Sequence, residues 1–339
     1  MIGRVAAALL IWLAMALPAQ AHELRPGYLE LVEESAGRFH VTWKRPAIGE
    51  TVIALRPTLP AACREELARR AEGAPTVLVE RWRIDCGRGG LAGQSLTVDG
   101  LATAMMHEGT YVDVLVRVSW RNGSTATGML QPGTPSWTVP GAGGEASGIW
   151  AFFRVGIDHI LMGADHLLFV LGLLLIVHGT RALLKTITAF TVAHSITLAL
   201  ATLGYARSPM LPLNACIALS ILLLGPEILR VQRGETSLTV RYPWLVAFAF
   251  GLFHGFGFAN GLQTMGLPPG EIPLALLLFN LGVEAGQVAF VTLMLLLTAS
   301  FRQLEVHWPR WAKTLPAYAI GSSGAFWLLT VIARMGVAR

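Results

Sequence analysis

Long apolar stretches dominate the second half of the chain. Each can cross the hydrocarbon core of a bilayer, which is about 30 Å thick and needs about 20 apolar residues in a helix. We therefore expect a polytopic α-helical membrane domain with six transmembrane helices. The stretches lie near 150–177, 184–203, 211–230, 242–262, 272–299 and 314–335.

A shorter apolar stretch lies at the start of the chain. Residues 5–17 are apolar, follow the basic Arg4 and precede Ala19-Gln-Ala21. The stretch is too short to span a bilayer, and signal peptidase needs small residues at the two alanine positions. The pattern predicts a cleaved signal peptide over residues 1–21, so the mature chain begins outside the cytoplasm.

Between these regions the chain alternates short β-rich runs with Gly, Pro and Asn. In Tyr111–Trp120, alternate valines share one face, whereas Asp113 and Arg117 share the other. Short strands separated by turn residues predict an exported β-sandwich domain of immunoglobulin-like type, interrupted by a short helix over Ala62–Ala71. The expected strands are Tyr28–Val32, Arg38–Trp43, Thr51–Leu55, Val77–Asp85, Ser95–Val98, Tyr111–Trp120 and Ala126–Leu130.

The domain boundaries follow from composition. Residues 131–148 are rich in Pro, Gly and small side chains, which is typical of a connection between domains. We place the exported domain at 22–140, a Gly/Pro-rich linker at 141–149 and the transmembrane domain at 150–339.

Cys63 and Cys86 are the only cysteines of the exported domain. Cysteine pairs form disulfides in oxidising compartments, and neither a CxxC nor a Cys/His spacing supports the alternative of a metal pair. We expect a disulfide between them that stabilises the domain by roughly 3 kcal/mol. Cys216 stands alone in an apolar segment and is interpreted as a small buried hydrophobic residue.

Composition and charge agree with a membrane protein. Of the 339 residues, 53% are hydrophobic and 14% charged, and the mean hydropathy is +0.55. An ordinary soluble domain has about 25% charged residues, so the composition argues against a soluble cytosolic enzyme. The net charge of +5 could suit nucleic acid, but the basic residues are scattered, so no nucleic-acid partner is expected. The chain has no P-loop pattern and is not expected to use ATP.

Basic residues gather in alternate loops between the apolar stretches. The outward loop around 204–211 has only Arg207, and the loop at 263–271 has no basic residue. This asymmetry agrees with the positive-inside rule and predicts a multi-pass protein of a bacterial inner membrane, with its N-terminal domain in the periplasm. The loops then placed in the cytoplasm carry Arg181, Lys185, Arg230, Arg233, Arg241, Arg302, Arg310 and Lys313.

The first membrane helix carries two Asp-His pairs, Asp158-His159 and Asp165-His166. Seven residues are nearly two helical turns, so the pairs occupy nearly the same face. Along a straight helix the two imidazoles would lie about 10.5 Å apart, too far to chelate one ion. The spacing favours two stations on a path, or one site and a relay. Met162, a soft ligand that would favour copper, lies between the two histidines in sequence.

Polar residues on later helices extend this pattern. Ionisable side chains in a bilayer cost several kcal/mol and are functional hypotheses by default. Imidazoles with carboxylates suit borderline divalent ions such as nickel, cobalt, zinc or ferrous iron. The candidate metal ligands are Asp158, His159, Asp165, His166, His194, His254 and Glu284, with Glu227 and Asn280 as weaker candidates.

Glycines near these residues have a packing interpretation. Gly156 and Gly163 repeat with the period of the Asp-His pairs, and Gly282 and Gly286 form a GxxxG motif in the fifth helix. Small residues at such spacing let membrane helices approach closely.

Four ordered motifs resemble the HupE/UreJ family of hydrogenase- and urease-associated membrane proteins. The resemblance covers roughly 150–335, and Ile160 stands where the better-known members carry a proline. The motifs are His159-x5-Asp165-His166-Leu-Leu-Phe169, Phe190-Thr-Val-Ala-His194-Ser-Ile-Thr-Leu198, Gly251-Leu-Phe-His254-Gly-Phe-Gly-Phe-Ala259 and Asn280-Leu-Gly-Val-Glu284-Ala-Gly-Gln287.

The resemblance implies a permease for nickel or a related divalent cation, with the His/Asp motif of the first helix in ion selection. The ion is then a substrate, either nickel or cobalt, with copper and zinc as alternatives, and we expect no tightly bound cofactor. The other expected partners are the lipid bilayer and a periplasmic metal-delivery protein.

Two other functions fit the same residues. Three histidines and an aspartate could hold a catalytic zinc ion, which would make the protein an intramembrane hydrolase in which Ser195 matters, although no HExxH signature is present. Alternatively, the polar residues only lock helices together and the exported domain binds a partner as an assembly factor.

The predicted mature N-terminus offers one further candidate. Cleavage after Ala21 makes His22 the first residue, whose α-amine and Nδ1 together can chelate Cu(II). His40 and His107 are the other histidines of the exported domain and could complete such a site.

Overall fold

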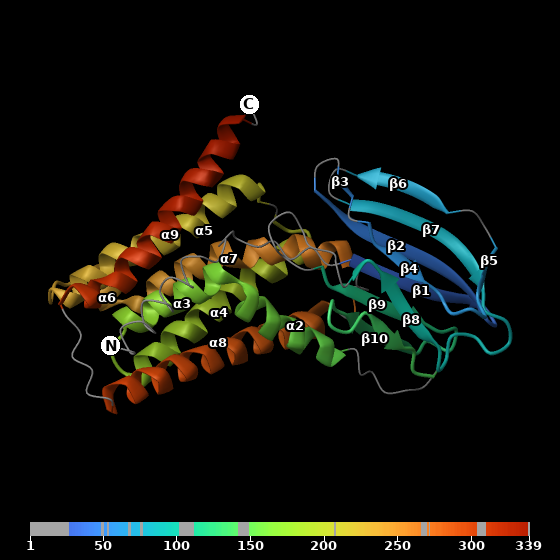
Figure 1. The fold of residues 1–339 in the computed structure, drawn as a ribbon, viewed down its shortest axis with the longest axis horizontal. Helices are drawn as coiled ribbons and strands as arrows, with labels where there is room; N and C mark the ends of the chain where they lie inside the picture. The colour runs from blue at the N-terminus through green and yellow to red at the C-terminus, as the bar shows by residue number, and fades with distance from the viewer. Residues whose placement is uncertain are drawn as a thin grey trace, which may run out of the picture. The chain divides into compact units, whose positions relative to one another are not determined.

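The computed structural model divides into two compact units, and each is described by itself (Figure 1). Leu24–Phe152 with Asn260–Ala275 form one unit; Phe153–Ala259 and Leu276–Arg339 belong to the other. The predicted signal peptide, His22, His107 and most of the linker lie outside the described residues. The structure describes residues 27–48, 51–52, 54–66, 69–74, 77–101, 112–141, 149–206, 208–265, 270, 272–303 and 310–337.

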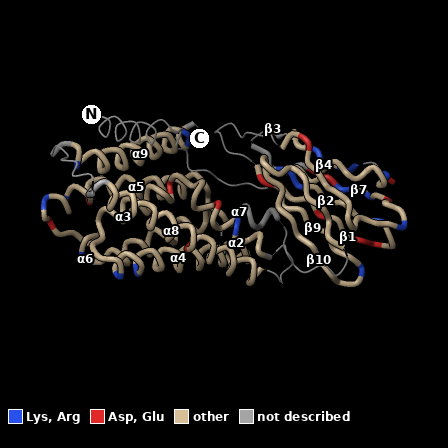
Figure 2. Tube along the Cα trace, turned by 60° about the horizontal axis from the view of Figure 1, so that its bottom comes forward, with Lys and Arg blue, Asp and Glu red and all other residues tan. Residues whose placement is uncertain are grey.

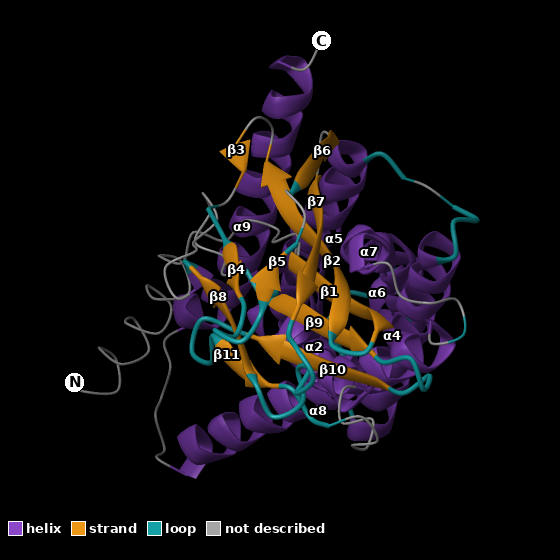
Figure 3. Cartoon of the chain, turned by 90° about the vertical axis from the view of Figure 1, so that its right-hand side faces the viewer, coloured by secondary structure: helices purple, strands orange, loops and turns teal. Residues whose placement is uncertain are grey.

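The first unit is built from two β-sheets. The larger sheet has the strand order β10-β9-β1-β2-β7-β5, with β3 paired to β2 and β6 to β7, and the smaller sheet has the order β11-β8-β4. Strands β1 and β9 run parallel, and the other strand pairs of these two sheets are antiparallel (Figure 3). The strands are β1 Gly27–Ser35, β2 Arg38–Ile48, β3 Thr51–Val52, β4 Arg56–Thr58, β5 Arg64–Glu65, β6 Arg70–Ala74, β7 Val77–Asp85, β8 Ser95–Asp99, β9 Val114–Ser119, β10 Thr125–Leu130 and β11 Ser136–Thr138.

Alternation along the strands creates one hydrophobic core that draws on both sheets. Leu29, Val41 and Trp43 of the larger sheet are fully buried in it, together with Leu96 of the smaller sheet. The predicted valine face is confirmed, because Val112, Val114, Val116 and Val118 all belong to this core. The unit is therefore the β-rich domain that the alternation predicts.

Three local predictions for this unit are wrong. The expected helix over Ala62–Ala71 is replaced by β5 and β6, which both pair with β7. A disulfide between Cys63 and Cys86 holds β5 against the end of β7, so tertiary contacts override the local helical pattern. The expected strand Thr51–Leu55 ends at Val52, and the chain continues into β4 of the other sheet.

The third error lies in the segment interpreted as a connection, 131–148. Ser136–Thr138 forms strand β11, which pairs with β8. Trp137 packs against Gly128, where a Cβ would come within 2.4 Å of the indole. A Pro- and Gly-rich composition therefore hides an edge strand, which is held by its pairing with β8 and by the contact of Trp137 with Gly128.

The second unit is helical. Four of its helices, α4, α5, α8 and α9, are long and apolar enough to cross a membrane, and α2 with α3 pass the same test as a bent pair. Charged positions are sparse along these helices in Figure 2. The chain is therefore a multi-pass membrane protein. The helices are α2 Ile149–Met162, α3 Ala164–Ile176, α4 Thr180–Thr202, α5 Met210–Gln232, α6 Leu238–Arg241, α7 Pro243–Met265, α8 Ile272–Gln303 and α9 Arg310–Val337.

The first predicted span is not one straight helix. Helices α2 and α3 meet at an angle of 71° at Gly163, whose backbone is extended (φ −79°, ψ 95°). A Cβ at this position would lie 2.8 Å from the His159 carbonyl oxygen and 2.8 Å from His166 Nδ1. The break therefore needs glycine, and it turns the second Asp-His pair back toward the first.

Near this break, glycines on α2 and α8 allow the two helices to pack closely against each other. A Cβ on Gly156 would lie 2.0 Å from the Phe279 carbonyl oxygen, and one on Gly282 would lie 2.0 Å from that of Phe153. Close helix approach is thus confirmed for Gly156 and Gly282, whereas Gly163 serves the bend instead.

Candidate metal centre

The bend at Gly163 brings together two histidines that a straight helix would separate. The ring centroids of His159 and His166 lie 4.8 Å apart. The prediction that they are too far apart to chelate one ion is therefore wrong. That prediction assumed one continuous helix. The extended backbone at Gly163 interrupts the helix and bends α3 away from the axis of α2.

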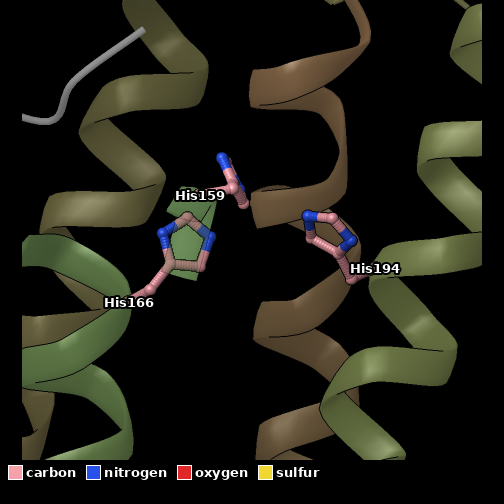
Figure 4. A group of neighbouring side chains, drawn as sticks. All are labelled: His159, His166 and His194. Carbon is pink, nitrogen blue, oxygen red and sulfur yellow. The ribbon is translucent and has the colours of Figure 1, made fainter. Parts of the chain in front are cut away.

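Helix α4 adds a third imidazole to this pair. The ring centroid of His194 is 6.0 Å from that of His159 and 6.2 Å from that of His166. One nitrogen from each of the three rings can be chosen so that all lie within 4.8 Å of one another. Figure 4 shows the three rings gathered around a common space.

A second group shares His166 with the first. Asp165, His166 and His254 also offer ligand atoms within 4.8 Å of one another. The His254 ring, from α7, is 4.8 Å from the His166 ring. We call the five side chains the imidazole cluster; its members are His159, Asp165, His166, His194 and His254.

Every member of the imidazole cluster is buried. Exposed fractions range from 0% for His194 to 6% for His159 and Asp165. A buried polar atom without a partner costs about 1–3 kcal/mol, so such atoms are normally paired. Within the described residues, five ring nitrogens of the cluster are buried and unpaired: Nδ1 and Nε2 of His159, Nε2 of His166, Nε2 of His194 and Nδ1 of His254.

Hydrogen bonds fix the tautomers of two of these rings. His166 Nδ1 lies 2.9 Å from Asp165 Oδ1, and a carboxylate accepts only, so Nδ1 carries the proton. His194 Nδ1 lies 3.2 Å from Asn280 Oδ1, and the Asn280 amide donates from Nδ2 to the Leu276 carbonyl oxygen. Both rings therefore keep a free lone pair on Nε2.

Ser220 of α5 fixes the third ring. Its hydroxyl donates to the Ile217 carbonyl oxygen at 2.6 Å, so it accepts from His254 Nε2 at 3.3 Å. The free lone pair of His254 is then on Nδ1. Metal-binding histidines almost always donate their other N–H to a carboxylate, amide or similar acceptor in this way.

Aromatic rings enclose the imidazole cluster. Phe258 and Phe279 stack with centroids 4.4 Å apart, and both rings pack against His159. Phe169 and Phe190 pack against His254. Because the cluster is buried among these rings, an ion held by the free nitrogens would lose most of its hydration shell.

Several predicted ligands lie elsewhere. Glu284 accepts a hydrogen bond from Thr188 of α4 at 2.6 Å. Glu227 pairs with Arg230 and Ser237 near the end of α5. Neither glutamate belongs to the metal-binding groups found among the described residues.

The remaining candidates on α2 and α8 differ in their placement. Asp158 Oδ2 is 4.0 Å from Arg154 Nε and lies outside both groups. Met162 is 71% exposed, so its side chain is not enclosed between the two histidines. Asn280 contacts the cluster through His194 rather than as a ligand.

Sequence reasoning missed two polar residues. Ser220 has no charge and stands alone in an apolar helix, so no motif marks it. Gln287 is fully buried and hydrogen-bonded to Thr191, and its sequence signal is its place in the motif that also contains Asn280 and Glu284.

Comparison with known proteins gives one match. A family model described as HupE / UreJ protein matches residues 139–331, which is more than half of the chain. No curated protein and no solved structure matches.

Proposed function

The chain belongs to the HupE/UreJ family, and we propose on that premise that it is a permease for a divalent transition-metal ion. The family is associated with nickel and cobalt transport. The imidazole cluster would be the selective binding site on the path. The ion is substrate and would pass through the helical unit rather than stay there.

One observation supports this proposal above all: buried imidazoles converge with their free lone pairs unpaired. His166 Nε2, His194 Nε2 and His159 Nε2 have no hydrogen-bond partner among the described residues. Burying unpaired ring nitrogens in a bilayer costs free energy, and one divalent cation could bind their lone pairs together. Nitrogen ligands suit nickel, cobalt, copper and zinc better than magnesium or calcium.

Asp165 gives the site its charge. Its carboxylate accepts from the backbone N–H and the ring Nδ1 of His166, at 2.9 Å each, so it is held beside the ring rather than in water. The negative charge offsets part of the ion's charge in a low-dielectric setting and makes His166 a stronger ligand.

We further propose six spans in a bacterial inner membrane, with the β-rich domain as a periplasmic sandwich. Helix α7 would be the sixth span, because 23 residues reach about 35 Å at 1.5 Å per residue. The periplasmic domain would receive the ion directly or from a delivery protein and pass it toward His159.

The alternative function is a zinc hydrolase. The three-histidine geometry is compatible with it, because open catalytic zinc sites use three protein ligands. Ser195, the serine that would matter in such a hydrolase, donates its hydroxyl to the Thr191 carbonyl oxygen at 2.7 Å. That bond runs along its own helix, and among the described residues Ser195 has no hydrogen bond to a base that could activate it as a nucleophile.

Metal uptake into proteoliposomes tests the permease. We expect the protein to carry Ni²⁺ or Co²⁺, and His166→Ala and Asp165→Asn to abolish uptake while remaining folded and inserted. His178→Ala is the matched control, because this histidine lies between α3 and α4, outside the cluster. Uptake by both cluster variants at the wild-type rate would refute the proposal.

A further inference from the structure

Thr191 of α4 and Gln287 of α8 form a hydrogen-bonded polar pair next to the imidazole cluster. Thr191 lies three residues before His194, which is about 4.5 Å along the helix axis. Its exposed fraction is 4%, and that of its partner Gln287 is 0%. Two uncharged polar side chains are thus buried within one helical turn of the candidate metal centre.

The hydrogen bonds of Thr191 and Gln287 leave one atom of the Gln287 amide without a partner among the described residues. Thr191 Oγ1 lies 3.3 Å from the Ile187 carbonyl oxygen and 3.0 Å from Gln287 Oε1, but a hydroxyl has only one proton. Gln287 Nε2 is buried and unpaired within the described part of the chain.

The position of the hydroxyl proton decides whether this pair can bind a cation. With the Thr191 proton on the Ile187 carbonyl oxygen, Thr191 Oγ1 and Gln287 Oε1 lie 3.0 Å apart with no proton between them. Each oxygen then offers a lone pair on the same side, and one cation can bind both.

On the faces that carry this pair, the next residues along both helices are apolar. Ile187 of α4 and Val291 of α8 pack with Val170 and Leu183 in a buried hydrophobic cluster. Thr191 and Gln287 therefore lie between the imidazole cluster and this apolar layer. An ion leaving His194 along α4 would meet their oxygens first.

We propose that Thr191 Oγ1 and the Gln287 amide oxygen form a second station for the transported cation. The inference rests on the proposed permease function. Neutral oxygens bind nickel or cobalt more weakly than imidazoles do, so this station would accept the ion without retaining it. Transport needs sites that bind strongly enough to admit an ion and weakly enough to release it.

The experiment separates binding at the imidazole cluster from transport. Full-length protein is titrated with Co²⁺ and its visible absorption recorded, and Co²⁺ uptake is measured in proteoliposomes. We expect Gln287→Leu and Thr191→Val to keep the Co²⁺ spectrum and affinity, and to slow uptake by about 10- to 100-fold through loss of an oxygen contact to a charged ion.

A matched control and an opposite variant complete the design. Thr292→Val removes a hydroxyl that bonds its own helix at 2.7 Å on an exposed face of α8, and it should leave uptake unchanged. Gln287→Glu adds a carboxylate, so we expect a second equivalent of bound Co²⁺ together with slow uptake. If Gln287→Leu does not fold, Thr191→Val and Gln287→Glu still test the second station.

Two results would overturn the second station. One is wild-type uptake by Gln287→Leu or by Thr191→Val. The other is loss of the Co²⁺ spectrum in these variants, because the pair would then only position the imidazoles. Failure of the wild-type protein itself to bind or carry Co²⁺ and Ni²⁺ would instead refute the permease, so the two failures are distinguishable.

Discussion

At the scale of single residues, the neighbours of each histidine decide what its ring can do. Asp165, Asn280 and Ser220 each take one ring N–H and leave the other nitrogen as a lone pair. The sequence identifies the histidines and Asp165, because charged and imidazole groups stand out in apolar helices. It does not mark Ser220, since a serine that bonds its own helix is common in membrane spans.

Asn280 offers the sharpest test of this arrangement. Asn280→Leu removes the acceptor for His194 Nδ1–H, so the ring can change its tautomer or rotate, and we expect Ni²⁺ affinity to fall about 10- to 100-fold. Asn280→Asp keeps an acceptor oxygen at this position and should retain most of the affinity. The measurement is Ni²⁺ titration of the purified protein, and equal affinity in the two variants would contradict the role.

At the scale of elements, the broken span is the feature that the hydrophobic pattern hides. Periodicity places His159 and His166 on one face but fixes their separation only if the helix is continuous. The extended backbone of Gly163 leaves no trace in hydropathy, because glycine also serves as a packing residue in membrane helices. The ligand types were therefore predictable, and their distance was not.

Gly163→Ala tests whether the bend builds the cluster. The new Cβ would come within 2.8 Å of the His159 carbonyl oxygen and His166 Nδ1, so one of these groups must move. We expect Co²⁺ affinity to fall by about tenfold or more, equivalent to about 1.4 kcal/mol. Gly257→Ala is the control, because a Cβ at Gly257 would have Ile217 Cδ1 as its nearest neighbour, at 3.9 Å, and the added methyl is accommodated. Unchanged Co²⁺ affinity in Gly163→Ala would show that the cluster forms without the bend.

At the scale of the whole molecule, composition predicts the division into a β-rich unit and a helical unit. The alternation of polar and apolar side chains locates most strands, and the apolar stretches locate the helices. The errors fall at Ala62–Ala71, at Thr51–Leu55 and at β11. At the first and the last of these, pairing with β7 and with β8 decides the structure. The β5–β7 and β8–β11 pairs join segments that other strands separate in the chain, so no local pattern contains them.

The number of spans sets the side of the membrane on which the C-terminus lies. Four helices and the bent pair make five spans by length and apolar character, and α7 makes six if it also crosses. With an exported N-terminal domain, six spans place the C-terminus outside, and five place it inside. The loop between α7 and α8 changes side in the same way.

Reporter fusions along the chain therefore decide whether α7 crosses. We expect alkaline phosphatase, active only outside, to be active when fused after Gly204, after Gly270 and after Arg339, and inactive after Gly234. Green fluorescent protein, which fluoresces inside, should give the reverse pattern. The fusions after Gly204 and Gly234 are the controls, since both topologies place them alike. Phosphatase that is inactive after Gly270 and Arg339 would show five spans, and α7 would then lie within the protein rather than across the membrane, although it carries His254 of the imidazole cluster.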